Sequence, residues 1–127
     1  MVYNGICNEA AIYGVNMKIF LDDTRLCPKG YEGVKSVEEF EKLVLANREL
    51  IEEISLDYDL SSSGSIRTGL SACDFLVKEK IVCPVIKIHS DHPCAVKMFD
   101  FLKENIENCD VLMEQYNILQ VMKEFDE

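Results

Sequence analysis

The stretch IFLDD at residues 19–23 decides the fold, because it places two acids directly after an apolar run. A similar stretch, ISLDYDL at residues 54–60, ends another short run with Asp57 and Asp59. Short apolar runs bounded by polar residues are typical of buried β-strands. We therefore predict two strands whose carboxyl ends carry acidic side chains.

Helical patterns alternate with strand-like segments along the rest of the chain. Ser36 and Glu39 form an S-x-x-E capping box, which predicts a helix from Val37 to about Asn47. Further helices are expected at 69–79 and from Pro93 to Ile106. A closing helix is expected where Ile118, Leu119, Met122 and Phe125 recur at helical spacing. Further strands are expected near 31–35, at 85–88 and at 111–113. Residues 24–33 are turn-like, so no helix is expected directly after the first strand. This alternation indicates a three-layer α/β domain, in which helices cover both faces of a parallel sheet.

Length and composition suit one domain with its own core, since the chain has 127 residues of which 48% are hydrophobic. We interpret residues 1–16, which show no clear period, as an N-terminal extension or arm, and residues 17–127 as the domain. No run approaches the ~18 apolar residues of a transmembrane helix, and the first residues lack the pattern of a signal peptide. We expect a cytoplasmic protein that does not bind membranes.

Charge and cysteine content narrow the possible partners. The formal net charge of −10 argues against nonspecific nucleic-acid binding, because such affinity comes from clustered Lys and Arg. A small anionic group could still bind at a local positive site or beside a cation. The six cysteines include no C-x-x-C pair, which favours free and mostly buried thiols.

Polar residues gather where three of the predicted strands end. In open parallel sheets the ligand crevice lies outside the carboxyl ends of the strands. The residues expected there are Asp22 and Asp23, Asp57 and Asp59, and His89 and Ser90. Converging carboxylates repel one another unless a hard cation neutralises them, so we expect Asp22, Asp23 and Asp57 to hold a divalent ion, Mg²⁺ or Mn²⁺. The alternative is that these acids are helix caps or solvated turn residues.

Candidate basic groups accompany the acids. His89 is a candidate for acid/base chemistry because imidazole titrates near neutrality, and a structural role at a strand end is the alternative. The H-x-x-H stretch from His89 to His92, followed by Cys94, raises a zinc site as a further alternative, although no second matching ligand pair occurs. Arg25 and Arg67 could bind a phosphate from opposite sides, or they could be ordinary surface residues.

Three segments in this order and spacing resemble the cyclic-phosphate processing receiver-like family: IFLDDTRLCP, ISLDYDLSSSGSIRTG and VIKIHSDHP. The resemblance spans about residues 18–106 and implies a flavodoxin-like sheet, related to the receiver domains of bacterial response regulators. Those domains carry an acidic pair after strand one, an acceptor Asp after strand three and a Ser or Thr after strand four, which Asp22-Asp23, Asp57 and Ser90 match. Asp59 is extra, and no lysine ends the last strand. Ordinary phosphotransfer signalling is therefore disfavoured.

The resemblance implies activity on cyclic phosphate ends of RNA or on small cyclic nucleotides, so the expected partner is a phosphate-containing small molecule or an RNA terminus. We interpret the protein as a metal-assisted phosphoesterase in which Asp57, Asp59 and His89 take part in catalysis. Arg25, Arg67 and Ser90 are expected to position the phosphate. The main alternative is a non-catalytic receiver-like module that binds a metal, a phosphate or a protein. A third reading is a haloacid-dehalogenase-type phosphatase, because residues 57–61 read D-x-D-x-S.

Overall fold

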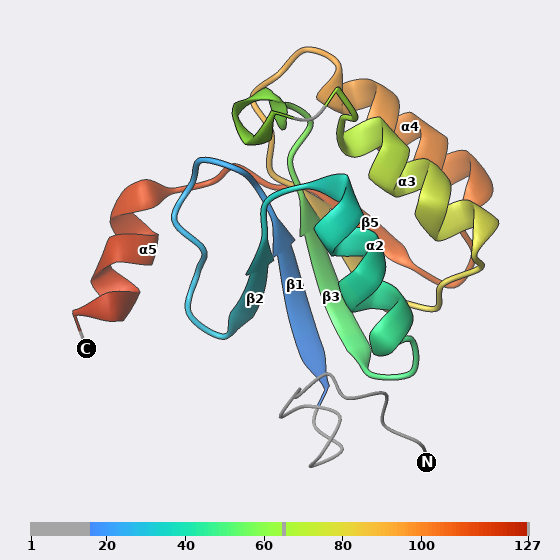
Figure 1. The fold of residues 1–127 in the computed structure, drawn as a ribbon, viewed down its shortest axis with the longest axis horizontal. Coiled ribbons are helices and arrows are strands. Elements are labelled where there is room, and N and C mark those ends of the chain that lie inside the picture. Colours follow the sequence, from blue (N-terminus) through green and yellow to red (C-terminus); the bar gives the residue numbers. More distant parts are fainter. Residues whose placement is uncertain (1–15, 65, 127) are drawn as a thin grey trace.

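A five-stranded parallel sheet forms the centre of the computed structural model, which describes residues 16–64 and 66–126 (Figure 1). Its strands are β1 (Met17–Leu21), β2 (Tyr31–Val34), β3 (Ile51–Leu56), β4 (Val85–Ile88) and β5 (Asp110–Met113). They lie in the order β2-β1-β3-β4-β5, and every neighbouring pair is parallel. The predicted α/β class with a flavodoxin-like sheet is confirmed.

Helices cover the two faces of this sheet unequally. Helices α2 (Val37–Ala46), α3 (Gly69–Lys78) and α4 (Ala95–Asn105) pack on one face, and α5 (Ile118–Phe125) stands apart beside the loop between β1 and β2 (Figure 1). A short 3₁₀ turn, η1 (Ser61–Ser63), stands between β3 and α3. The Ser36 side chain accepts the N–H of Glu39, whose carboxylate accepts the N–H of Lys35, so the predicted capping box begins α2.

The core between the sheet and helices α2 to α4 fixes the register of the strands. Leu21, Leu56 and Ile88 end β1, β3 and β4, stand beside one another in the sheet and are 0% exposed. Burying a side chain of this size contributes roughly 1.5–3 kcal/mol. A slip by one residue would turn these side chains out of the core, so the residue that follows each strand is held at a defined place.

The opposite face of the sheet is only partly covered. Residues 22–30 form no helix, as predicted, so β1 leads into β2 through a loop. In α5 Val121 is buried, but the apolar stripe expected to close the domain is 46% to 75% exposed at Ile118, Leu119, Met122 and Phe125. The sheet surface beneath carries Lys87, which is ion-paired with Glu53 and Glu114, and such a surface gives an apolar stripe little to bury against.

The remaining sequence predictions concern membrane helices, the cysteines and the N-terminal extension, and the structure describes only part of the residues involved. No helix in the described ranges is long and apolar enough to cross a membrane. Five described cysteines are free, and burial raises the pKa of Cys73 and Cys83 to about 12. Apart from Asn16, the extension predicted at residues 1–16, together with Cys7, lies outside the described residues.

Candidate functional site

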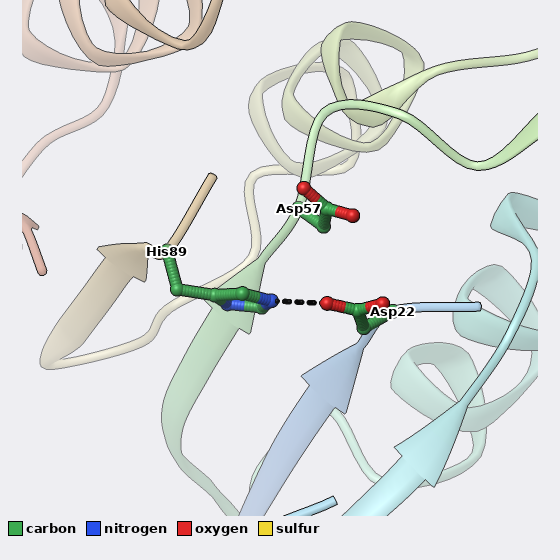
Figure 2. A group of neighbouring side chains, drawn as sticks. All are labelled: Asp22, Asp57 and His89. Atoms are coloured by element: carbon green, nitrogen blue, oxygen red, sulfur yellow. Dashed lines mark hydrogen bonds and ion pairs between the residues drawn. The ribbon is translucent and has the colours of Figure 1, made fainter. Parts of the chain in front are cut away.

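Three strand ends converge at the carboxyl edge of the sheet. Asp22, Asp57 and His89 directly follow β1, β3 and β4 and are 4%, 4% and 3% exposed. Their side chains point toward one another, and one possible ligand atom from each lies within 4.8 Å of the others (Figure 2). A cavity of about 460 Å³ opens at this edge, lined by residues 23–25, by Asp57, Asp59 and Ser62, and by residues 90–92.

Asp22 is the most heavily hydrogen-bonded carboxylate of the site. Its Oδ1 accepts the backbone N–H groups of Thr24 and Arg25, at 2.9 and 3.0 Å, which turns the chain sharply after β1. Its Oδ2 lies 3.1 Å from Arg25 Nη1 and 2.9 Å from His89 Nε2. Burial alone would raise the pKa of Asp22, but the hydrogen bonds from His89, Arg25 and Thr24 hold that pKa well below its usual range. Asp22 is therefore an ionised anchor.

Arg25 lies between the two buried carboxylates. Its Nη1 is 3.1 Å from Asp22 Oδ2 and 3.3 Å from Asp57 Oδ2, and its Nη2 is 3.4 Å from Asp91 Oδ2. Burial would lower the pKa of Arg25, but the hydrogen bond and charge of Asp22, with Asp57 and Asp91, raise it. The guanidinium thus acts as the countercharge of the site, and the phosphate-binding role predicted for it stays a prediction.

Arg25 compensates the negative charge of ionised Asp57 only in part. Asp57 Oδ1 accepts the N–H of Tyr58 at 2.8 Å. Burial and the nearby charge of Asp22 raise the pKa of Asp57, and the hydrogen bond from Ser90 and the charge of Arg25 compensate only in part. The ionised form of Asp57 is accordingly disfavoured by its surroundings, which is what an additional cation would relieve.

His89 is enclosed rather than open to the cavity. Its Nε2 lies 2.9 Å from Asp22 Oδ2, its Nδ1 lies 2.7 Å from Ser55 Oγ, and its ring stacks on Phe20 at 4.4 Å between centroids. In the tautomer with the proton on Nε2, the ring donates to ionised Asp22 and Nδ1 accepts from the Ser55 hydroxyl. Since both nitrogens are engaged, His89 orients Asp22 directly, and its predicted acid/base role stays a prediction.

Asp23 and Asp59 also line the cavity. Both contact the loop at residues 61–64, called the serine loop below, rather than the buried group of Asp22, Asp57 and His89. Asp23 Oδ2 accepts the N–H of Ser63 at 3.0 Å, so this acid ties the loop after β1 to the loop after β3. Asp59 is exposed, and its Oδ1 accepts the N–H of Ser61 at 2.9 Å. The compact group of possible ligands consists of Asp22, Asp57 and His89, and the metal-binding role expected for Asp23 stays a prediction.

Ser90 and Arg67 differ in placement. Ser90 lines the cavity, lowers the pKa of Asp57 through its side chain and accepts the N–H of His92 through Oγ at 3.1 Å. Arg67 is ion-paired with Glu41 on α2, at 2.7 Å, and is not part of the cavity lining. Ser90 thus lies in the cavity and Arg67 lies beside a helix, and the phosphate-binding role expected for both stays a prediction.

Tyr116 is a neighbour of the site that sequence reasoning missed. Its hydroxyl donates to the carbonyl of Leu26 at 2.8 Å, and its ring lies 5.6 Å from the Arg25 guanidinium carbon. A cation this close to an aromatic face is attracted by the ring quadrupole. Its position shortly after β5, at the same carboxyl edge, is the signal that could have identified it.

The donor set suits a divalent cation. Two carboxylates and an imidazole are ligands that Mn²⁺ and related ions accept, and Mg²⁺ prefers the oxygens. Asp22 Oδ2 and Asp57 Oδ2 both face Arg25 Nη1, so a cation would compete with the guanidinium for the same atoms. Neither His92 nor Cys94 belongs to this group, which leaves the zinc alternative without support among the described residues.

A parallel sheet in the order 2-1-3-4-5 with buried acids after its first and third strands defines a receiver-like α/β domain. The family model of the cyclic-phosphate processing receiver domain matches residues 17–105. The chain belongs to this family, as the three sequence motifs predicted. No curated protein and no solved structure matches it.

Proposed function

We propose that the protein is a metal-assisted phosphoesterase-type domain that acts on cyclic phosphate ends of RNA or on small cyclic nucleotides. The observation that carries the proposal is the meeting of Asp22 and Asp57 at Arg25, beside a cavity that Asp57 and Arg25 line. Two carboxylates can hold a cation, and a guanidinium can bind a phosphate oxygen. Family membership supports the choice of a cyclic phosphate.

The charge of the cavity favours a cyclic phosphodiester over a phosphomonoester. Its lining carries four carboxylates, Asp23, Asp57, Asp59 and Asp91, against the single guanidinium of Arg25. A phosphomonoester carries a charge of about −1.5 to −2 at neutral pH, whereas a cyclic diester carries only one negative charge. The diester therefore meets less repulsion, and its more highly charged product is more easily released.

Asp22 and Asp57 would hold the divalent cation, Mg²⁺ or Mn²⁺, which when bound would supply Lewis-acid polarisation of a phosphoryl oxygen. Because Arg25 uses the same carboxylate oxygens, its guanidinium becomes available to the phosphate once these carboxylates are otherwise neutralised. Ser90, whose side chain lines the cavity beside Asp57, would position a phosphoryl oxygen through its hydroxyl.

Opening a cyclic phosphate adds one water to phosphorus and breaks one P–O bond to the ribose. The attacking water loses a proton, and the departing ribose oxygen gains one. Asp59 is an exposed carboxylate of the cavity lining, and we assign these proton transfers to it. His89 supports the reaction by keeping Asp22 oriented and ionised.

The free cysteines accord with a reducing, cytoplasmic setting. The net charge of −10 favours a small nucleotide or an RNA terminus over a long RNA as the partner.

The test is turnover of nucleoside 2′,3′-cyclic phosphates and of RNA ending in a cyclic phosphate, with Mg²⁺ or Mn²⁺, beside the corresponding 3′-monoesters. The proposal expects cation-dependent opening of the cyclic substrates and no hydrolysis of the monoesters. Equal activity on both substrate types would refute the charge argument, and no activity with any cation would refute the enzyme.

A non-catalytic receiver-like module is the second candidate, and one observation favours it. His89 has both ring nitrogens engaged and is 3% exposed, so the buried group contains no imidazole nitrogen turned to a substrate. Binding of a cyclic nucleotide without any turnover, in the assay above, would identify this alternative.

A further inference from the structure

We propose that His92 forms a stacking platform for a nucleobase at one side of the same cavity. The ligand is then a nucleoside-bearing cyclic phosphate, and its base as well as its phosphate is recognised. This inference rests on the proposed function and adds the chemistry of the rest of the ligand.

The ring of His92 is held in one orientation although the residue is exposed. It stacks on Tyr58 with 4.3 Å between centroids and 28° between planes. Its Nδ1 accepts the backbone N–H of Cys94 at 3.0 Å. An exposed side chain usually exchanges rotamers freely, so two restraints on one ring prepare a flat surface before any ligand arrives.

The partner ring of Tyr58 is itself anchored. Its hydroxyl interacts with the side chains of Cys94 and Thr68, and Cys94 contributes most to the raised pKa of Tyr58. Thr68 caps α3 by accepting the N–H of Leu70 at 3.2 Å, and Cys94 is the residue that precedes α4. The pair of rings is therefore attached to the first turns of two helices rather than to a free loop.

Ser90 connects this platform to the phosphate side of the cavity. Its Oγ accepts the N–H of His92 at 3.1 Å, and its side chain also interacts with Asp57, whose pKa it lowers. Both ends line one cavity of about 460 Å³, a volume within the ~300–1,000 Å³ range of small-molecule sites. A phosphate near Asp57 thus places the remainder of its molecule within reach of His92.

A nucleobase suits this wall better than a charged group does. Histidine is among the side chains on which unpaired bases stack, and stacking tolerates any base because every base has a π-face. The base is neutral, so the four carboxylates of the lining do not repel it. His92 is the one aromatic side chain in the lining of this cavity, as far as the described residues show.

Two substitutions separate stacking from the local structural role of His92. His92→Asn removes the ring but keeps an acceptor for the Cys94 N–H, because Asn readily bonds the backbone two residues ahead. His92→Phe keeps the ring against Tyr58 and removes the acceptor. If the residue only capped the turn before α4, His92→Phe would be the damaging change and His92→Asn the silent one.

The experiment measures dissociation constants by rapid mixing with Mg²⁺, before any turnover, for adenosine 2′,3′-cyclic phosphate and for a methyl riboside 2,3-cyclic phosphate that lacks the base. The native protein should prefer the nucleoside by roughly tenfold or more. His92→Asn should abolish this preference without weakening the base-free probe, and His92→Phe should retain it at a lower melting temperature.

The possible results distinguish a failure of the stacking platform from a failure of the proposed function. Equal affinity of the native protein for the two probes, or an undiminished preference in His92→Asn, would overturn the platform while leaving cyclic-phosphate binding intact. If neither probe binds the native protein with any divalent cation, the proposed function itself fails and the platform falls with it.

Discussion

Arg25 is the residue that balances the charges of the site. Its guanidinium approaches Asp22 and Asp57 through one nitrogen, with side chains that are 25%, 0% and 5% exposed. In this arrangement a fixed positive charge of the chain occupies the position that a cation would need. Arg25 therefore offsets part of the carboxylate charge and would compete with a cation for the same oxygens.

Replacing Arg25 with Ala should separate these two effects. Without cation, the variant should lose about 1–3 kcal/mol of unfolding free energy, because two buried carboxylates lose their partner. Its affinity for Mn²⁺, measured by calorimetry, should rise severalfold because the competitor is gone. Arg48→Ala, which removes an exposed ion pair with Glu79, is the control and should change neither value appreciably. Weaker Mn²⁺ binding by Arg25→Ala would refute the competition.

Asp57→Asn should stabilise the protein in metal-free buffer at neutral pH. The pKa of Asp57 is raised in the folded state, mainly by burial and then by Asp22, so its ionised form opposes folding. A raised carboxyl pKa means that the folded state takes up the proton first as the pH falls. The advantage of Asp57→Asn should therefore be full at neutral pH and fade toward about pH 4.

Urea denaturation of both proteins at several pH values measures this difference. Comparing the two proteins cancels the opposite contribution of Asp22, whose lowered pKa makes it stabilising above its ordinary pKa and less so as the pH falls. A variant less stable than the native protein at neutral pH would show that Arg25 gains more from Asp57 than burial costs.

At the scale of elements, the site depends on how closely α3 approaches the end of β3. Gly69, the first residue of α3, donates its N–H to the carbonyl of Tyr58 at 2.9 Å. A Cβ at this position would collide with the backbone carbonyl of Asp57 and with the side chain of Met98. A glycine is required here by space, since a methyl group would push the helix off the strand that carries Asp57.

Gly69→Ala should therefore destabilise the protein by about 1–3 kcal/mol and weaken cation binding at the same time. Ser71→Ala, in the same first turn, is the matched control and should stay within about 0.5 kcal/mol of the native protein. Thermal unfolding and Mn²⁺ titration of both variants test this. Normal stability and normal Mn²⁺ affinity in Gly69→Ala would contradict the close packing.

The elements could be predicted where local signals agreed with the fold. The capping box at Ser36 and Glu39 and the apolar spacing of α3 and α4 are local, and the structure reproduces them. The exposure of the apolar stripe of α5 was not predictable in this way. Its spacing specifies a helix with an apolar side, but the surface available to that side depends on the ion pairs of Lys87, which form only in the assembled sheet.

The site was predictable to the extent that strand ends determine it. Asp22, Asp57 and His89 follow aligned strands, so their meeting follows from the topology. The placement of Asp23 follows instead from the turn that Asp22 caps with its own carboxylate, and this turn sends Asp23 to the serine loop. Arg67 pairs with an acid 26 residues away, a distance over which sequence spacing carries no geometric information.

At the scale of the whole molecule, the residues that stabilise the fold lie apart from the residues of the candidate site. The buried leucines and isoleucines between the sheet and α2 to α4 hold the fold, while the acids gather in loops at one edge. A ligand at that edge binds the folded chain but not the unfolded one. Divalent cations should consequently stabilise the entire domain through this one edge.

Magnesium or manganese should raise the melting temperature, by an amount that corresponds to about 2.7 kcal/mol when the cation is at 100 times its dissociation constant. Because the chain carries a net charge of −10, any salt screens self-repulsion, so the control is NaCl at matched ionic strength. The extra stabilisation should be absent in Asp57→Asn. An equal effect of NaCl would show that the cations act only by screening.

The most direct measurement is phosphorus NMR of adenosine 2′,3′-cyclic phosphate incubated with the protein and Mg²⁺. The account predicts conversion of the cyclic phosphate signal into a phosphomonoester signal, abolished by EDTA and by Asp57→Asn but retained in Ser71→Ala. A cyclic phosphate signal that persists unchanged with native protein and Mg²⁺, or a conversion that Asp57→Asn performs equally well, would contradict it.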